Sequence, residues 1–454
     1  MSFRTLALAG VCLAHALPLA ATQDLPQLAY EKFTLPNGLQ VILHEDRSVP
    51  LVAVNVWYHV GSADELPGRT GFAHLFEHVM FMGSENVPVG QFDVWMESAG
   101  GSSNGSTTED RTNYYEDVPS NALPLALWLE ADRMGWLLPT LDQEKLDLQR
   151  EVVKNERLEN FDNRPYGRAT ETILAALFPS DHPYSWTVIG SMDDLSAASL
   201  DDVKAFFRKW YAPNNATLVI AGDFERDETK AWVEKYFGAI PRGPAIERRA
   251  SVPAPRIQRD TFLLLEDRVQ LPRVYYAWGS PKAFAPGDAE FDLIRQILVG
   301  GKDSRLYKRL VYDLQIAADV SGFQSGQRLD GIFQLQFTAK PGHEPTELAA
   351  VVDEEIARLV AEGVTDRELE AARNGYMARL LDRMSSVNGK SEELAYYDYF
   401  LGEPNSLRAD ADRYLRAKPA DLQNLARVLF ARPKVVLTVV PEGDTSLLVP
   451  GGRR

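Results

Sequence analysis

The sequence predicts an α+β fold made of two homologous α/β sandwich domains. Three observations carry this prediction: the length of the chain, a proline-rich segment near its middle, and a repeat on either side of that segment. With 454 residues the chain is too long for one hydrophobic core and of ordinary length for two domains. The segment IPRGPAIERRASVPAPR (240–256) has four prolines, several charges and no apolar period, which is typical of a linker.

The two halves begin alike. The first begins LPNGLQVILHEDRSVPLVAVNVWYHVGS (35–62), whose apolar-rich runs 41–43 and 51–58 flank a turn and predict two strands. The second begins TFLLLEDRVQLPRVYYAWGS (261–280), which repeats the order of strand, Glu-Asp-Arg turn, proline and strand. The halves therefore start with the same strand pair.

The two halves also end alike. SLDDVKAFFRKWYAPNNATLVIAGD (199–223) and PADLQNLARVLFARPKVVLTVVPEG (419–443) each give an amphipathic helix, a proline turn and a β-branched strand. Strands and helices are mixed within each half, which favours two sandwiches of similar topology. We expect a first domain over 25–240, a linker over 241–256, a second domain over 257–446 and a tail over 447–454.

The first residues differ in character from the rest. Arg4 precedes an apolar stretch from Leu6 to Leu19, and small residues follow at Ala20 and Ala21. This pattern predicts a secretory signal peptide over 1–21, and hence a periplasmic or secreted protein. A buried helix or a membrane anchor is the alternative, but the run is short for a membrane span, and no later segment is apolar for long enough.

Composition excludes several partners and ligands. The formal net charge of −16 argues against nucleic acid and against an anionic membrane surface. Cys12 is the only cysteine and lies in the predicted signal peptide, so the mature chain would have no disulfide and no thiolate ligand. Any bound metal must be held by nitrogen and oxygen.

One helical segment, GFAHLFEHVMFMG (71–83), combines apolar residues with His74, Glu77 and His78. Positions i and i+4 share one helix face, so both imidazoles can reach one ion, with Glu77 beside them. The alternative is a pair of hydrogen-bonded core histidines, which would be costly to bury together with a carboxylate. The apolar neighbours are expected to pack in the core: Phe72, Leu75, Phe76, Val79 and Phe81.

The repeat provides a test of the metal interpretation. Placing Gly83 over Gly300 puts the three polar residues over Phe291, Ile294 and Arg295. The second half thus keeps the helix without the polar residues, so the fold does not require them.

Zinc at a catalytic site takes three protein ligands and keeps one position for water. Because no cysteine is available, the third ligand should be a carboxylate. The order His-x-x-Glu-His inverts His-Glu-x-x-His and is the inverzincin signature. Nitrogen and oxygen ligands would also accept cobalt or manganese.

At this point the sequence resembles a known family. The stretches 68–123, GRTGFAHLFEHVMFMGSENVPVGQFDVWMESAGGSSNGSTTEDRTNYYEDVPSNAL, and 149–167, QREVVKNERLENFDNRPYG, are similar to the pitrilysin or insulinase-type zinc metallopeptidases of family M16. The resemblance covers nearly all of the mature chain and is strongest to the short, half-length bacterial members. It implies a LuxS/metallohydrolase-like fold, one zinc ion per chain and peptide hydrolysis.

The resemblance also implies the third ligand, a glutamate on a later helix. Glu151 and Glu156 both lie in that segment, and their spacing points them to different helix faces. The family pattern favours Glu156 over Glu151. The family often has another glutamate seven positions before the ligand, where this chain has Gln149.

The run GGSSNGSTTED (100–110) alone would be interpreted as a loop. The resemblance implies instead an edge strand beside the zinc, on which a substrate peptide lies as an added strand. Asn104, Gly105 and Ser106 are then candidate substrate-binding residues, and Gly105 departs from the family's usual alanine. The alternative for Asn104 is an ordinary turn asparagine.

In family members whose second half completes the active site, an arginine and a tyrosine follow in the region equivalent to GGKDSRLYKRLVYDLQIAADV (300–320). This chain has residues 315–318, Gln-Ile-Ala-Ala, where the tyrosine is expected. We therefore expect a second M16-like subunit, identical or distinct, that supplies the missing groups and closes a chamber admitting unfolded peptides.

The predicted function is a zinc-dependent endopeptidase for oligopeptides, with Glu77 as the general base that takes a proton from the attacking water. Two alternatives stay open: a processing-type subunit that removes presequences, and a scaffold subunit of the same fold that has lost catalysis. The remaining histidines of the mature chain are expected to be structural or exposed: His44, His59, His182 and His343.

Overall fold

The computed structural model describes residues 25–248 and 257–451. The predicted signal peptide, the second part of the predicted linker and the last three residues lie outside the described residues. In what is described, residues 241–248 form neither helix nor strand. Val449 is buried, and its N–H donates a hydrogen bond to Thr438 Oγ1 of the strand β11 (Val435–Pro441).

The first half contains a six-stranded sheet in the order β1-β2-β6-β3-β5-β4. Its β2 and β6 run parallel, and the other neighbours run antiparallel. The bounds are β1 (Glu31–Thr34), β2 (Gln40–Glu45), β3 (Leu51–Tyr58), β4 (Ser102–Thr107), β5 (Thr112–Pro119) and β6 (Ala216–Gly222). The strands predicted at 41–43 and 51–58 are confirmed, and β4 lies at the free edge.

The second half contains a five-stranded sheet in the order β7-β11-β8-β10-β9. Here β7 and β11 are the parallel pair, so this order matches β2-β6-β3-β5-β4 strand for strand. The bounds are β7 (Thr261–Asp267), β8 (Arg273–Ser280), β9 (Ala317–Gly326), β10 (Gly331–Ala339) and β11 (Val435–Pro441). The α+β prediction and the internal repeat are therefore both confirmed.

The helices also follow the repeat. The first half has α1 (Phe72–Val79), α2 (Gln91–Ser98), α3 (Leu123–Trp136), α4 (Gln143–Arg157), α5 (Ala169–Leu177), α6 (Met192–Ala197), α7 (Leu200–Trp210) and α8 (Arg226–Phe237). The second half has α9 (Asp288–Val299), α10 (Arg305–Tyr307), α11 (Pro345–Glu362), α12 (Asp366–Arg383), α13 (Val387–Leu401), α14 (Leu407–Arg416) and α15 (Pro419–Phe430). Helix α1 packs on α4 in the first half, and the equivalent helix α9 packs on α12 in the second half.

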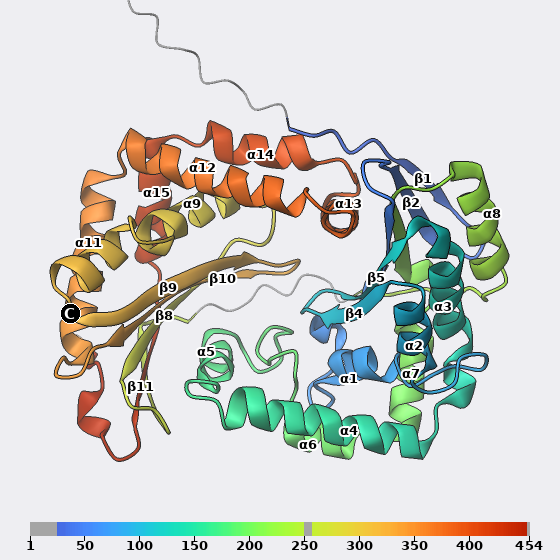
Figure 1. Ribbon diagram of the computed structural model, residues 1–454. Helices are drawn as coiled ribbons and strands as arrows, with labels where there is room; N and C mark the ends of the chain where they lie inside the picture. The colour runs from blue at the N-terminus through green and yellow to red at the C-terminus, as the bar shows by residue number, and fades with distance from the viewer. Residues whose placement is uncertain (1–24, 249–256, 452–454) are drawn as a thin grey trace, which may run out of the picture.

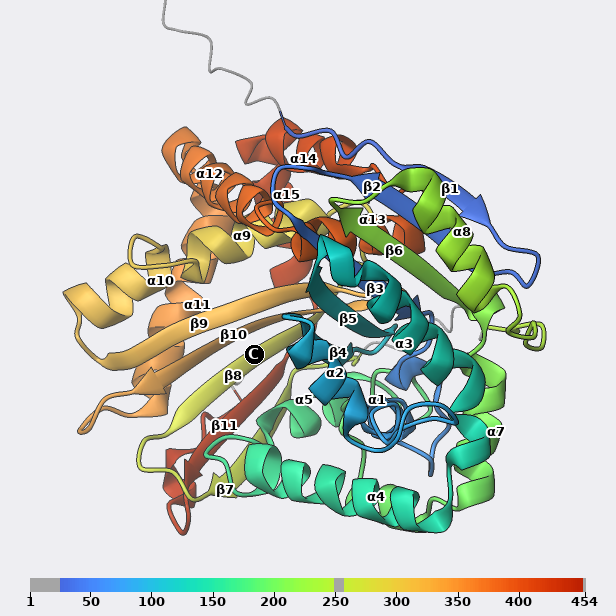
Figure 2. The ribbon, with the colours of Figure 1, turned by 45° about the vertical axis from the view of Figure 1, so that its right-hand side comes forward.

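The two halves exchange one helix each. Helix α13 of the second half packs on β3 and β6 of the first sheet, while α5 of the first half packs on β11 and β8 of the second. Accordingly, Trp57 and Val219 of the first sheet belong to the second half's hydrophobic core, and Ile173 of α5 packs with Val439 of β11. Figures 1 and 2 show these helices where the halves meet. Each sheet is thus covered on one face by its own helices and on the other by a helix of the other half.

The helices that carry or lack the polar residues start in the same way. Gly71 before α1 and Gly287 before α9 both adopt left-handed backbone, with φ of 86° and 96°. Matching these glycines aligns His74, Glu77 and His78 with Glu290, Leu293 and Ile294, one position away from the alignment on Gly83 and Gly300. The alignment shifts because one more residue lies between Gly287 and Gly300 than between Gly71 and Gly83. In either register the second helix lacks the two histidines.

The described residues include no helix that is both long and apolar enough to traverse a bilayer.

Candidate metal centre

Helix α1 is fixed at its start by a buried carboxylate. Glu65 accepts hydrogen bonds from the backbone N–H groups of Gly71 and Ala73, at 3.0 and 2.8 Å. These are N–H groups that a helix leaves without an internal partner. The predicted packing face is confirmed: Phe72, Leu75, Phe76 and Val79 are buried in the first core and Phe81 packs against it. The other face of α1 therefore presents its polar residues in a fixed orientation.

The structure brings His74, His78 and Glu156 together. Glu156 Oε2 lies 3.3 Å from His78 Nε2 and 3.7 Å from His74 Nε2, and the three ligand atoms all lie within 4.8 Å of one another. Ligand atoms about 2.1 Å from a tetrahedral zinc would be separated by about 3.4 Å. Two imidazole nitrogens and one carboxylate oxygen at these separations fit zinc.

Helix α4 carries both candidate glutamates, Glu151 and Glu156. It starts at the N-cap Asp142, whose side chain accepts a bond from Lys145 N at 2.9 Å, and it packs against α1. Glu156 points toward the two histidines, whereas Glu151 is exposed and pairs with Lys154 at 2.9 Å. Gln149 donates from its amide to Met82 Sδ at 2.8 Å.

Glu77 lies beside the three candidate ligands and is not one of them. Its Oε2 accepts a hydrogen bond from Thr107 Oγ1 at 2.6 Å, and a Cβ built on Gly105 would lie 3.0 Å from its Cγ. Burial raises the pKa of the Glu77 carboxyl, an effect that the Thr107 hydroxyl partly offsets. Burial, and then the neighbouring His78, lower the pKa of His74 to about 4, which favours the neutral imidazole that a metal needs.

The edge strand β4 passes over this carboxylate. Because side chains alternate along a strand, Gly105 and Thr107 face Glu77 while Asn104 and Ser106 lie on the other face. Asn104 is exposed, and its Oδ1 accepts a bond from Gly105 N at 2.8 Å. Ser106 Oγ donates to Asn113 Oδ1 on β5 at 2.7 Å. The glycine leaves room above the carboxylate that an alanine methyl group would narrow.

The other histidines lie apart from this cluster. His44 Nδ1 bonds Ala29 O at 2.7 Å, His59 Nε2 bonds Thr217 Oγ1 at 3.0 Å, His182 Nδ1 accepts from Tyr184 N at 3.1 Å, and His343 pairs with Glu347 at 2.9 Å. Within residues 25–248 and 257–451, one group of three or more histidine, cysteine, aspartate or glutamate side chains is placed to share a metal ion, and it consists of His74, His78 and Glu156.

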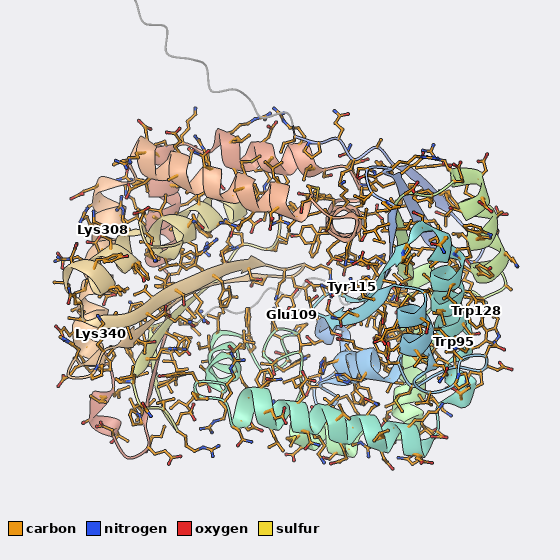
Figure 3. All side chains as sticks on the ribbon, in the orientation of Figure 1. Trp95, Glu109, Tyr115, Trp128, Lys308 and Lys340 are labelled. Atoms are coloured by element: carbon orange, nitrogen blue, oxygen red, sulfur yellow. The ribbon has the colours of Figure 1, made fainter. Side chains whose placement is uncertain are left out.

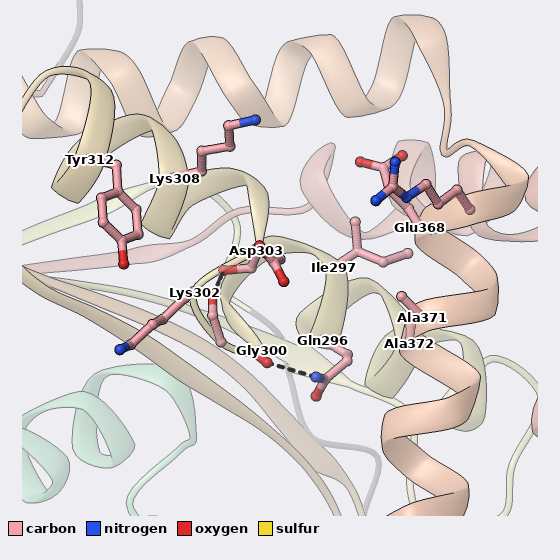
Figure 4. A pocket seen from close by; sticks show the side chains of 13 residues that line it. Gln296, Ile297, Gly300, Lys302, Asp303, Lys308, Tyr312, Glu368, Ala371 and Ala372 are labelled. Carbon is pink, nitrogen blue, oxygen red and sulfur yellow. Dashed lines mark hydrogen bonds between the residues drawn. The ribbon is translucent and has the colours of Figure 1, made fainter.

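One cavity lies away from this site. It measures about 610 Å³ and lies in the second half between the C-terminal end of α9 and α12, as Figure 4 shows. Gln296 and Glu368 line it, and Lys302 and Lys308 project beside it. None of the candidate ligands lines it, so the candidate metal centre is identified by the geometry of its ligands and not by the size of a cavity.

Two residues near the site were not anticipated from the sequence. Thr107 could have been found, because strand alternation places it on the same face as Gly105. Arg111 could not, because its role depends on Glu392 of α13, 281 positions along the chain, with which it pairs at 3.5 Å.

Two family models match the chain. One, described as insulinase (peptidase family M16), matches residues 40–186, and the other, described as the peptidase M16 inactive domain, matches residues 197–376. The chain belongs to peptidase family M16. The insulinase match contains all four residues of the centre, and the inactive-domain match contains none of them.

Similar M16-type proteins have been named or solved. The zinc protease PqqE of Helicobacter pylori is 29% identical over 418 residues, covering 88% of this chain and 90% of the relative. The zinc protease YmxG of Bacillus subtilis, named as uncharacterized, is 22% identical, covering 91% and 99%. A crystal structure of a protease from Helicobacter pylori superposes with a TM-score of 0.84 at 26% identity, covering 92% of this chain and all of that one. The M16 inactive domain from Pseudomonas fluorescens, at 20% identity and a TM-score of 0.82, shows the same fold.

Proposed function

We propose that this chain is a zinc-dependent endopeptidase that hydrolyses unstructured oligopeptides. The observation that carries the proposal is the convergence of His74, His78 and Glu156 from two helices, with a second carboxylate beside them that is not a ligand. A metal-storage site would not need Glu77. The printed names of the relatives, which are zinc proteases, support the same activity.

The proposed mechanism assigns one role to each group. Zinc held by the three side chains would lower the pKa of water and polarise the scissile carbonyl. The Glu77 carboxylate accepts a proton from the attacking water and delivers it to the leaving amine. The hydrogen bond from Thr107 fixes the orientation of the carboxylate.

The substrate is proposed to bind as an added strand on the free edge of β4. Backbone pairing of this kind depends little on side chains and accepts many sequences. Asn104, Gly105 and Ser106 are the proposed contacts, and the Gly105 N–H, now bonded to its neighbour's side chain, would turn to the peptide. Extended, unfolded peptides can pair in this way, whereas folded proteins cannot.

A second M16-like subunit is the proposed partner, and the periplasm or the extracellular space the proposed location. The second half lacks the tyrosine expected near Ala318, so a partner that supplies it would complete the site. A processing-type activity on presequences would use the same residues. A silent scaffold is disfavoured because all four residues of the centre are in place.

The test is a cleavage assay on a mixture of unstructured peptides with the zinc-loaded protein and a Glu77→Gln variant. We expect cleavage by the wild type and none by the variant, with one zinc per chain in both. Full zinc occupancy without cleavage by the wild type, even after addition of a co-purified partner subunit, would contradict the proposal. Cleavage restricted to presequence-bearing peptides would favour the processing activity instead.

A further inference from the structure

The β4–β5 hairpin (102–119) contains the proposed substrate strand and owes little of its order to apolar packing at that strand. Strand β4 reads Ser-Ser-Asn-Gly-Ser-Thr, without one apolar side chain, and has no neighbour on its outer side. A strand of this composition at a sheet edge is poorly specified by hydrophobic burial. Its position must therefore depend on polar contacts.

The turn of the hairpin is held by residues of the second half. Asp110, which is 3% exposed, accepts a bond from Arg328 N at 2.8 Å through its side chain and one from Tyr399 Oη at 3.0 Å through its carbonyl. Arg328 lies in the β9–β10 turn and Tyr399 on the exchanged helix α13. Figure 1 shows the β9–β10 turn reaching toward β4, and Figure 3 shows Glu109 of the hairpin turn near the middle of the molecule.

A carboxylate of the same exchanged helix supports the hairpin next to its turn. Glu392 Oε2 accepts three hydrogen bonds at 3.0 Å each, from Asn55 Nδ2, Trp57 Nε1 and Asn113 Nδ2 of the first sheet. Its other oxygen lies 3.5 Å from Arg111 Nη2. Hydrogen bonds to an ionised acceptor are the stronger kind, so this residue joins the halves firmly.

Arg111 connects Glu392 to β4. Its guanidinium lies over the Trp57 ring at 5.2 Å and donates to both the carbonyl and the hydroxyl oxygen of Ser106, the carbonyl at 2.8 Å. The next residue, Thr107, bonds Glu77 on the opposite face. A chain of contacts therefore runs from α13 through Arg111 and Ser106 to the proposed general base.

We propose that Glu392 is a positioning residue of the proposed peptidase. Through Arg111 and Asn113 it fixes the edge strand that receives the peptide and that orients Glu77. This inference rests on the proposed function. The half without the metal ligands would thus act on the reaction indirectly. Because the edge strand is already ordered, a binding peptide does not bear the entropic cost of ordering it.

The test compares Glu392→Gln with a matched control, Glu393→Gln. Glu393 is the next residue of α13, is buried, and pairs with Arg383 within the second half. Glu392→Gln keeps an amide oxygen for the three donors and removes the charge that faces Arg111. Peptide-cleavage kinetics, zinc content and amide hydrogen exchange of 102–112 are measured on the full zinc-loaded protein.

For Glu392→Gln we expect KM to rise about tenfold or more, with one zinc still bound and kcat changed less than KM. Exchange of the hairpin amides should be faster by a similar factor. Arg111→Gln should give the same phenotype, and the double variant should be no worse than either single one, because the two residues act on one contact. Glu393→Gln should leave KM and hairpin exchange unchanged, whatever its effect on stability.

Unchanged hairpin exchange in Glu392→Gln, or a loss of thermal stability with KM unaltered, would overturn the inference. If the wild-type protein binds zinc and cleaves no peptide even after addition of a co-purified partner subunit, the proposed function fails, and hydrogen exchange alone then decides whether Glu392 orders the hairpin.

Discussion

Helices α1 and α9 occupy equivalent places in two equivalent sheets, yet only α1 carries two histidines with a glutamate. Both start at a glycine with left-handed backbone, and both pack against the equivalent later helix, α4 or α12. Where α1 has Glu77 and His78, α9 has Leu293 and Ile294, both buried in the core. The polar residues of α1 are therefore an addition to an arrangement of helix and sheet that packs without them.

The largest effect is expected from giving α1 the residue of α9. His78→Ile removes one of the three candidate ligands, so the variant should bind no zinc at stoichiometric levels and should cleave no peptide above background. Its metal-free form should be as stable as the metal-free wild type or more so, because an imidazole beside a carboxylate is replaced by an apolar side chain. Metal analysis and urea unfolding of the two apo proteins check both points; a marked loss of apo stability would show that the frame does need the histidine.

The next largest effect is expected from replacing Glu77, the carboxylate that is not a candidate ligand. Glu77→Gln keeps the shape of the side chain and its bond to Thr107, and removes the base. We expect kcat to fall by about 10²–10⁴-fold with zinc content unchanged. Single-turnover cleavage with metal quantification on the same sample measures this, and a variant that retains wild-type kcat would reassign the proton transfer to another group.

The first half contains a buried cluster of charged side chains whose disruption should lower the stability of the protein. Arg133 of α3 is 2% exposed, pairs with Glu116 and Glu130, and lies over the Tyr114 ring at 4.4 Å. Arg133→Met should lower the free energy of unfolding by about 3–5 kcal/mol, because two carboxylates stay buried without their cation.

The equivalent helix α11 of the second half provides the control. It carries the same spacing in Glu355 and Arg358, whose atoms pair at 3.1 Å, but the Arg358 side chain is 52% exposed. Arg358→Met should therefore cost at most about 1 kcal/mol in the same denaturant titration. Equal losses in the two variants would contradict the assigned role of burial.

The smallest effect concerns an ion pair between the halves. Lys390 of α13 bonds Asp46 and lowers the pKa of that carboxyl from 3.8 to about 2. Because the folded-state pKa is depressed, the stabilisation is fully present above about pH 4 and is lost as the pH falls through 2. The difference in unfolding free energy between wild type and Asp46→Asn should be at most about 1 kcal/mol at pH 5 and should shrink toward pH 2. A difference that grows on acidification would refute this assignment.

Local features of the molecule could be predicted from the sequence, and long-range ones could not. The strands at 41–43 and 51–58, the repeat and the packing face of α1 follow from periodicity, which the chain itself displays. The choice of Glu156 over Glu151 depended on a family pattern, and the structure places only Glu156 beside the histidines. The apolar residues of α5 and α13 indicate that both helices are partly buried but not against which sheet, so their exchange between halves was not foreseeable. Arg111 and Glu392 meet only because of that exchange.

Of the two equivalent helices, only α1 is expected to contribute to a metal site. Diffraction from zinc-loaded crystals, collected on either side of the zinc absorption edge, would locate the metal. We expect one anomalous peak per chain, within bonding distance of His74 Nε2, His78 Nε2 and a Glu156 carboxylate oxygen, and none beside α9. A peak that excludes Glu156, or a fully loaded site elsewhere in the chain, would contradict this expectation.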